Sequence, residues 1–180
     1  MMDLIKEETK GNYSLLKKLH QRLQGGHVIR YHTCPDVGKG QTNASHSWRA
    51  MVILTTLWPD IDKKALIWLL YHDVAEAELG DLPATAKWKY ENLAFAYKEC
   101  ETEWEKKLEL PYSFEDLSKQ DQEKVKMADM LELILHCKRQ MQLGNTLAEP
   151  VYLKGREYLF SQFSKLKDFE VVKSVLAEVN

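Results

Sequence analysis

Apolar residues recur at three- and four-residue steps along most of the chain, which is the spacing of helices that bury one face. Capping residues, glycines and prolines mark where these segments begin and end. The predicted helices cover approximately residues 12–25, 43–58, 60–80, 84–107, 118–143 and 147–175, the last stretch as one or two helices. Strands are not required by this pattern, so it predicts an all-α fold, a compact helical bundle that forms a single domain over residues 1–180.

Residues 27–42 interrupt the helical pattern. They contain Pro35, Gly38 and Gly40 and show no periodicity, so we expect a loop of about 15 residues. Loops of this length inside compact domains are usually functional. The loop carries an arginine next to aromatic side chains, in the run Val28-Ile29-Arg30-Tyr31-His32.

The charges of the chain are close to balanced. Lys and Arg number 25 against 27 Asp and Glu, which gives a net charge of −2 and indicates neither a polymeric nucleic acid nor an anionic membrane as partner. A hydrophobic share of 44% over 180 residues is enough for a full core without disulfides or a structural metal. A bound metal would therefore be free to serve chemistry.

Three further features bear on the cellular location. The 3 cysteines are far apart and form no CxxC pair, which is typical of a reducing compartment. No run of about 18 apolar residues is present, as a membrane-spanning helix would need. The first residues mix acids with apolar side chains, unlike a signal peptide. We therefore expect a cytoplasmic protein that does not span a membrane.

Ionisable residues within apolar helical segments are the anomaly of this sequence, because an unpaired buried charge is costly. They are His46, the pair His72-Asp73, and Asp129. Two imidazoles and two carboxylates are donors that a divalent transition metal accepts. Glu76 falls one turn after His72-Asp73, where a general base acting on metal-bound water would be needed. Taken singly, such a histidine is more often a capping or packing residue, and such an aspartate is usually solvated.

These residues match the H…HD…D signature of the HD-domain metal-dependent phosphohydrolases, an all-helical superfamily that the chain resembles. Residues 72–87, HDVAEAELGDLPATAK, resemble the HDxxExxxGDLPxxxK segment of the bacterial 5′-deoxynucleotidases. Residues 125–129, VKMAD, resemble their VKxAD segment, and phage relatives that include dATP triphosphohydrolases share this layout. The resemblance covers about residues 28–145, and the predicted C-terminal helices of residues 146–180 add nothing specific to it.

The resemblance implies a role for each residue that matches the family pattern. The implied metal ligands are His46, His72, Asp73 and Asp129. The implied catalytic residues are Glu76, which would activate water, and Asp81, a second acid near the leaving group or sugar. The implied phosphate-binding residues are Arg30, Lys87 and Lys126, while Tyr31 and His32 would line a base or sugar pocket. An arginine fork, two lysines and a dication supply the positive charge that a phosphoester needs.

Some residues depart from the family pattern or fit another interpretation. Bacterial members usually have a glutamate where this chain has Ser45, and a tryptophan where it has Tyr31, beside the expected base pocket. Lys87 lies near Lys89, and the alternative for it is a place on a solvated face. The spacing of Glu132 and His136 is ExxxH, whereas a di-iron bundle repeats ExxH on two helices.

We therefore expect a hydrolase that cleaves the 5′-phosphoester of deoxynucleotides with metal-activated water. The expected substrate is a deoxynucleoside monophosphate. The alternative is dATP or another deoxynucleoside triphosphate, from which the reaction would release inorganic triphosphate. The expected cofactor is one divalent transition metal, with Zn, Co or Mn as candidates, and a further Mg or Mn ion with a polyphosphate. The alternatives are a non-catalytic nucleotide-binding module and a structural bundle without metal. We also expect a homo-oligomer, in which the aromatic-rich segments 88–104 and 152–163 either face a neighbour or belong to the core.

Overall fold

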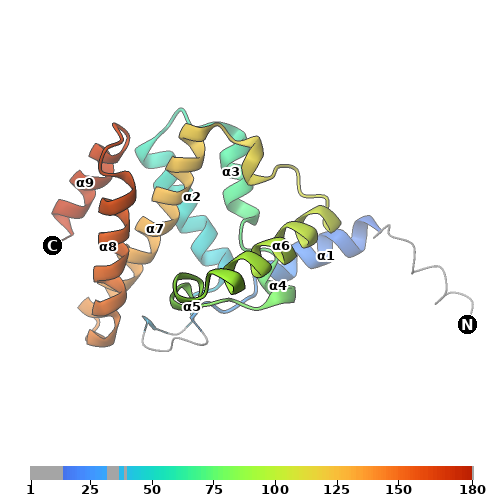
Figure 1. Cartoon of the computed structure of the whole chain (residues 1–180), viewed down its shortest axis with the longest axis horizontal. Helices are drawn as coiled ribbons and strands as arrows, with labels where there is room; N and C mark the ends of the chain where they lie inside the picture. Colours follow the sequence, from blue (N-terminus) through green and yellow to red (C-terminus); the bar gives the residue numbers. More distant parts are fainter. Residues whose placement is uncertain (1–13, 32–36, 39, 180) are drawn as a thin grey trace, which may run out of the picture.

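The computed structural model describes residues 14–31, 37, 38 and 40–179, and this part of the chain is mostly helical (Figure 1). The α-helices are α1 Leu15–Gly25, α2 Asn43–Leu57, α3 Lys63–Tyr71, α4 Glu76–Leu79, α5 Ala84–Lys89, α6 Glu91–Lys107, α7 Lys119–Gln142, α8 Glu149–Phe163 and α9 Phe169–Glu178, with short 3-10 helices η3 Phe114–Asp116 and η4 Thr146–Ala148. Within the described residues, strand-like pairing is limited to an isolated antiparallel bridge between Ile29 and Thr42. The predicted all-α fold is confirmed.

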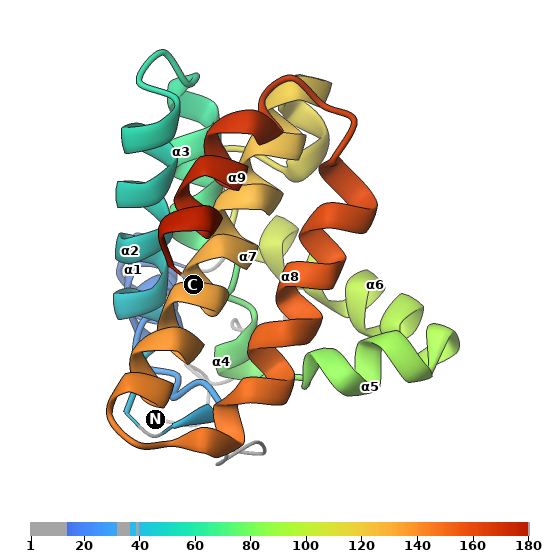
Figure 2. The same cartoon turned by 90° about the vertical axis from the view of Figure 1, so that its left-hand side faces the viewer.

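Helix α7 runs through the middle of the core and packs against α2, α3, α8 and α9 (Figure 2). The buried apolar side chains of α7 are Val125, Met127, Ala128, Leu131, Ile134 and Cys137. They meet Leu54 of α2, Leu69 of α3 and Leu159 of α8, which are fully buried. Burial of side chains of this size contributes about 1.5–3 kcal/mol each, so this packing fixes α2, α3 and α7 relative to one another. These helices carry or adjoin all of the predicted metal ligands.

The aromatic-rich segment 152–163 lies in α8 and belongs largely to this core. Tyr152 and Phe163 are 7% and 6% exposed, and both pack in the main hydrophobic cluster. Gly155 of α8 permits a close approach to α7, because a Cβ atom there would lie 3.0 Å from Cγ1 of Ile134. Most aromatic side chains of segment 152–163 therefore pack in the core of this chain.

Two of the predicted helices are each divided in the structure. The segment 60–80 forms α3 and α4, which are separated by a turn at residues 72–75. Apolar residues lie on both sides of His72-Asp73 at helical spacing, so the sequence predicts one helix where the structure has a break at this pair. The segment 84–107 forms α5 and α6, which meet at Tyr90, whose φ of −126° and ψ of 87° are not helical. The direction of the chain thus changes just before and just after the segment that carries Glu76 and Asp81.

Helix α1 has the predicted amphipathic pattern, but its apolar face is not covered within the described part of the chain. Leu15, Leu16, Leu19 and Leu23 are 83%, 76%, 51% and 60% exposed. The helix is attached at its C-terminal end, where a Cβ atom on Gly25 would lie 2.8 Å from Cα of Val74. This contact between backbones requires glycine, and it places the end of α1 next to the turn that carries Asp73.

The lengths of the helices bear on membrane insertion. A helix that crosses a bilayer needs about 20 mostly apolar residues. Among the helices in the described ranges, none is both long and apolar enough to do so.

Candidate metal centre and active site

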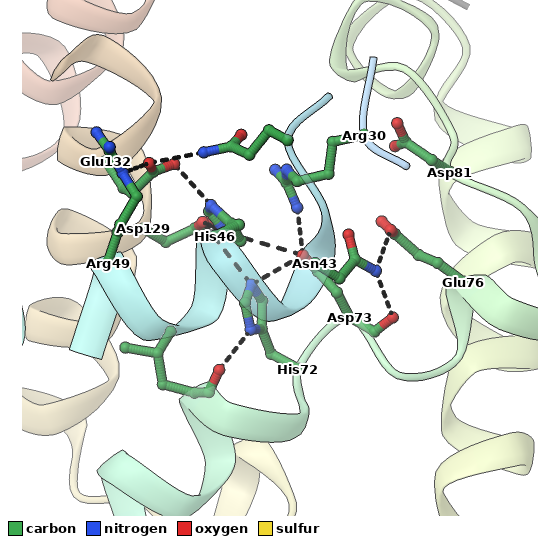
Figure 3. A network of polar contacts seen from close by, with 12 residues as sticks. Arg30, Asn43, His46, Arg49, His72, Asp73, Glu76, Asp81, Asp129 and Glu132 are labelled. Carbon is green, nitrogen blue, oxygen red and sulfur yellow. Dashed lines mark hydrogen bonds and ion pairs between the residues drawn. The ribbon is translucent and has the colours of Figure 1, made fainter. Parts of the chain in front are cut away.

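The four predicted metal ligands come together where α2, α3 and α7 meet (Figure 3). His46 lies in the first turn of α2, His72 and Asp73 follow the end of α3, and Asp129 lies in α7. Oδ1 of Asp129 is 2.9 Å from Nε2 of His46 and 3.8 Å from Nε2 of His72. Oδ2 of Asp73 is 3.7 Å and 3.2 Å from the same two nitrogens. Residues separated by up to 83 positions in the sequence therefore form one cluster.

Both imidazoles direct the same ring nitrogen into the cluster. Nδ1 of His72 is 2.7 Å from the carbonyl oxygen of Leu69, and Nδ1 of His46 is 2.7 Å from Oε2 of Glu132. Each Nδ1 therefore donates a proton outward, which leaves the lone pair of Nε2 for the interior of the cluster. Nε2 of His46 is buried and makes no hydrogen bond of ordinary geometry with another described residue.

This donor set fits a divalent metal ion. Donor atoms of His46, His72 and Asp73 all lie within 4.8 Å of one another, and Asp129 approaches both histidines. Two neutral imidazole nitrogens and two carboxylates suit zinc, manganese, cobalt or iron. An ion between these atoms would also satisfy the buried Nε2 of His46.

The pKa values in the cluster show how strongly its charges interact. Burial and Arg30 oppose protonation of His46, but the carboxylates of Asp129 and Glu132 outweigh them and raise its pKa to about 9. Burial opposes ionisation of Asp129, yet the two nearby imidazoles hold its pKa well below the usual value. His46 therefore carries a proton on both ring nitrogens at neutral pH unless a cation displaces the one on Nε2. The Asp129 side chain is 40% exposed, against 0–16% for the other three, so the cluster opens to solvent on its side.

Glu76 begins α4 and lies next to the cluster, where it is 6% exposed. The amide Nδ2 of Asn43 donates to Oε2 of Glu76 at 2.8 Å and to the carbonyl oxygen of Asp73 at 3.2 Å. Burial, reinforced by the charge of Asp73, raises the pKa of Glu76 to about 8. A carboxyl group with this pKa can both accept and release a proton near neutral pH.

Arg30 is held against the cluster by the loop that precedes α2. The bridge of Ile29 to Thr42 closes this loop, and the N–H of Arg30 donates to the carbonyl oxygen of Gln41 at 2.9 Å. Nη1 of Arg30 forms an ion pair with Oδ2 of Asp73 (Figure 3). The predicted phosphate ligand thus lies directly beside a predicted metal ligand.

Asp81, the predicted second acid, contacts Tyr31, which is expected to line the sugar or base pocket. The N–H of Tyr31 donates to Oδ2 of Asp81 at 3.1 Å, and the φ of Tyr31 is 61°, in the left-handed region that few non-glycine residues adopt. The ring of Tyr31 stacks on His136 at a centroid distance of 5.3 Å. Asp81 therefore contacts the backbone next to Arg30, and His32 lies outside the described residues.

The two predicted phosphate-binding lysines contact aromatic rings. Nζ of Lys87 is 4.9 Å from the ring centroid of Tyr97, and Nζ of Lys126 is 4.7 Å from that of Phe114. Among the described contacts, neither lysine has an ion pair with the cluster. Of the three predicted phosphate ligands, Arg30 alone therefore has a described ion pair with the cluster.

Several polar residues around the cluster were missed by the sequence analysis. Gln41 and Arg49 each donate to Glu132 behind His46, and Asn43 donates to Glu76. The available signal was Glu132, an acid within the apolar run of α7. Glu132 also lies three residues after Asp129, on nearly the same side of α7, which points toward the cluster.

The fold and the site define a helical bundle with a histidine and aspartate cluster at its centre. A family model described as 5′-deoxynucleotidase YfbR-like matches residues 41–175. The chain therefore belongs to the YfbR-like 5′-deoxynucleotidase family. The predicted membership of the HD-domain 5′-deoxynucleotidase branch is confirmed.

Two known proteins illustrate this relationship. A 5′-deoxynucleotidase of Vibrio atlanticus (strain LGP32) is 30% identical over 112 residues, which cover 56% of this chain and 58% of the relative. The match thus spans little more than half of the length of that relative. The crystal structure of the PH0347 protein from Pyrococcus horikoshii OT3 superimposes with a TM-score of 0.70 at 21% identity, covering 92% of this chain and 98% of that chain. This second likeness concerns the fold alone.

Proposed function

We propose that this protein hydrolyses the 5′-phosphoester of deoxynucleotides at the cluster of His46, His72, Asp73 and Asp129. The observation that supports the proposal is the convergence of these four donors with Arg30 and Glu76, in a chain of the YfbR-like family. This reaction requires donors that bind a cation, an arginine that binds the phosphate, and an acidic residue that accepts and returns a proton.

In this proposal the two imidazole Nε2 atoms and the carboxylates of Asp73 and Asp129 hold one divalent cation. When bound, such an ion lowers the pKa of a coordinated water toward about 7 and stabilises negative charge on a phosphoryl oxygen. Glu132 and the carbonyl oxygen of Leu69 keep the Nδ1 protons of the two histidines outside the cluster. The ligands therefore do not need to rearrange before the ion binds.

Glu76 takes the proton of the attacking water. Asn43 donates to Oε2 of Glu76 and so leaves Oε1 available to a water molecule. Burial keeps the pKa of Glu76 high, so its ionised form is a strong base, and positive charge bound at the neighbouring cluster would favour that ionised form at neutral pH. Glu76 can then return the proton to the sugar oxygen that leaves, or to solvent.

Arg30 binds the substrate phosphate. Its guanidinium is pinned by the ion pair with Asp73, and its planar fork can present further N–H groups to phosphate oxygens. We assign Lys87 and Lys126 to the outer phosphates or the approach path, since their flexible stems now lie over Tyr97 and Phe114. Tyr31 and His32 would border the sugar and base, with Asp81 fixing the backbone of Tyr31.

The experiment that tests this function is a hydrolysis assay on dAMP and dATP, each with Mn²⁺, Co²⁺, Zn²⁺ or Mg²⁺. Phosphate, pyrophosphate and triphosphate are resolved to identify the bond that is cut. We expect release of phosphate from dAMP or of triphosphate from dATP, and loss of turnover in Asp129→Asn. Asp60→Asn, an exposed position in the turn before α3, is the matched control and should retain full activity. Binding without turnover would favour the nucleotide-binding module, and neither binding nor turnover would refute the proposal.

We also propose that two copies of this chain associate through the apolar face of α1. The face is formed by Leu15, Leu16, Leu19 and Leu23 together with Trp48 of α2 and Leu70 of α3, and it borders a groove of about 420 Å³. The exposed parts of these side chains amount to roughly 800 Å², which is what one partner contributes to a standard interface. Light scattering should show a dimer that Leu19→Glu converts to a monomer and that Leu153→Glu on α8 leaves intact. A monomeric parent protein would refute this proposal.

A further inference from the structure

A buried group of polar residues lies behind His46, on the side away from Asp73 (Figure 3). Its centre is Glu132 of α7, which is 0% exposed. Oε2 of Glu132 is 2.7 Å from Nδ1 of His46, and Oε1 accepts from Nε of Arg49 at 2.6 Å and from Nε2 of Gln41 at 2.9 Å. Three donors from two other segments of the chain therefore converge on one carboxylate.

The burial of the Glu132 carboxylate has to be compensated by contacts within the protein. Transfer of an ionised carboxylate into the protein interior is costly unless partners compensate for the lost hydration. Here both oxygens have partners, and the positive charge of Arg49 lies directly against one of them. Glu132 is therefore a fixed negative charge in contact with the ring of His46.

The second histidine of the cluster lacks such a partner. Nδ1 of His72 contacts only the neutral carbonyl oxygen of Leu69 among the described residues. A charged acceptor gives a shorter and stronger hydrogen bond than a neutral one, and it increases the electron-donating power of the opposite ring nitrogen. The two imidazoles are thus held with different strength, and His46 is held more strongly.

We infer that Glu132 is a positioning residue that fixes the orientation and tautomer of His46, and that Gln41 and Arg49 fix the carboxylate of Glu132 in turn. Glu132 acts through His46 and does not touch the substrate or the cation. The inference depends on the metal site of the proposed function, but it does not depend on phosphoester hydrolysis. It adds three residues to the site, and two of them lie on segments that also carry Arg30 and His46.

The test is the affinity of the purified protein for Zn²⁺ alone, measured at pH 8 by competition with a chromophoric chelator. Glu132→Gln keeps an oxygen that accepts from His46 but loses the charge, whereas Glu132→Leu removes the acceptor at similar volume. Loss of a partner behind a metal-bound histidine weakens binding roughly 10–100-fold. We expect Glu132→Gln to lie near the lower end of this range and Glu132→Leu near the upper end. Glu123→Gln, nine residues earlier on the same helix, is the matched control and should bind like the parent protein.

Thermal unfolding of each variant without metal separates positioning from structural support. A purely structural role would lower the melting temperature of Glu132→Gln and leave the Zn²⁺ affinity of the folded protein within twofold of the parent, and this result would overturn the inference. If the Glu132 variants do not fold, Gln41→Leu keeps the pair of Glu132 and His46 but removes one bond that orients it. It should then weaken Zn²⁺ binding by several-fold, and unchanged affinity would overturn the inference. A parent protein that binds Zn²⁺ but hydrolyses no nucleotide would refute the proposed function and leave this test intact.

Discussion

Replacement of Glu76 by glutamine should abolish turnover and at the same time stabilise the protein. Glu76 is 6% exposed, and burial raises its pKa from 4.5 to about 8. The folded chain therefore keeps the Glu76 proton at pH values where the unfolded chain has released it. Under this condition the free energy of unfolding falls as the pH rises from about 4.5 to about 8. The glutamine side chain is neutral at every pH, and its oxygen can still accept from Asn43.

The size of this effect follows from the pKa difference. Each pKa unit corresponds to about 1.4 kcal/mol, so ionisation of Glu76 costs the folded state roughly 3 kcal/mol at pH 7 and roughly 4 kcal/mol at pH 8. Below pH 4.5 the cost vanishes, because Glu76 is protonated in both states. Glu76→Gln should therefore equal the parent protein in stability near pH 4 and exceed it by about 3 kcal/mol at pH 7.

The assay is urea unfolding of both proteins from pH 4 to pH 9 with EDTA present. Subtraction of the two curves removes the contributions of titrating groups that both proteins share. Turnover of dAMP and dATP is measured in parallel with metal, where loss of a general base lowers the rate by about 10²–10⁴-fold. Parallel stability curves, or a variant that becomes less stable toward high pH, would show that the pKa of Glu76 is not raised by burial.

Three further predictions test the surroundings of the site. Zn²⁺ at about 100 times its dissociation constant should stabilise the parent protein by about 2.7 kcal/mol, and Asp129→Asn should lose most of this gain in a thermal melt. Arg30→Lys keeps the charge but loses the planar fork, so kcat/KM should fall at least about tenfold, and an unchanged value would contradict phosphate binding by Arg30. Gly25→Ala should lower the free energy of unfolding by about 1–3 kcal/mol, because its Cβ would lie 2.8 Å from Cα of Val74; urea unfolding with equal stability would disprove this contact.

The cluster was accessible from the sequence because its members interrupt apolar helical patterns. His46, His72-Asp73 and Asp129 stand out against the residues that surround them, and their chemistry indicates a cation. Their convergence follows from the packing of α2, α3 and α7, which periodicity predicts as elements but does not place in space. The residue types alone therefore predict a metal-donor set, whereas the distances between the donor atoms follow only from the packing of the helices.

Residues that support the cluster were harder to predict, because their role depends on contacts across the fold. Glu132 is an acid within the apolar run of α7, but only the packing of α2 against α7 shows that its partner is His46. The turn at residues 72–75 is not evident in the sequence, because apolar residues at helical spacing lie on both sides of it and it contains neither glycine nor proline. The exposed leucines of α1 show a further limit, since an amphipathic pattern predicts a face to be covered but does not identify what covers it.

The distribution of the cluster along the chain also sets an order of events during folding. His46 precedes Asp129 by 83 positions, so a chain growing at about 5–20 residues per second presents the first donor seconds before the last one. Until α7 docks against α2, only part of the donor set exists. Binding of a cation by all four donors would consequently be a late event, because it requires that α7 has already packed against α2.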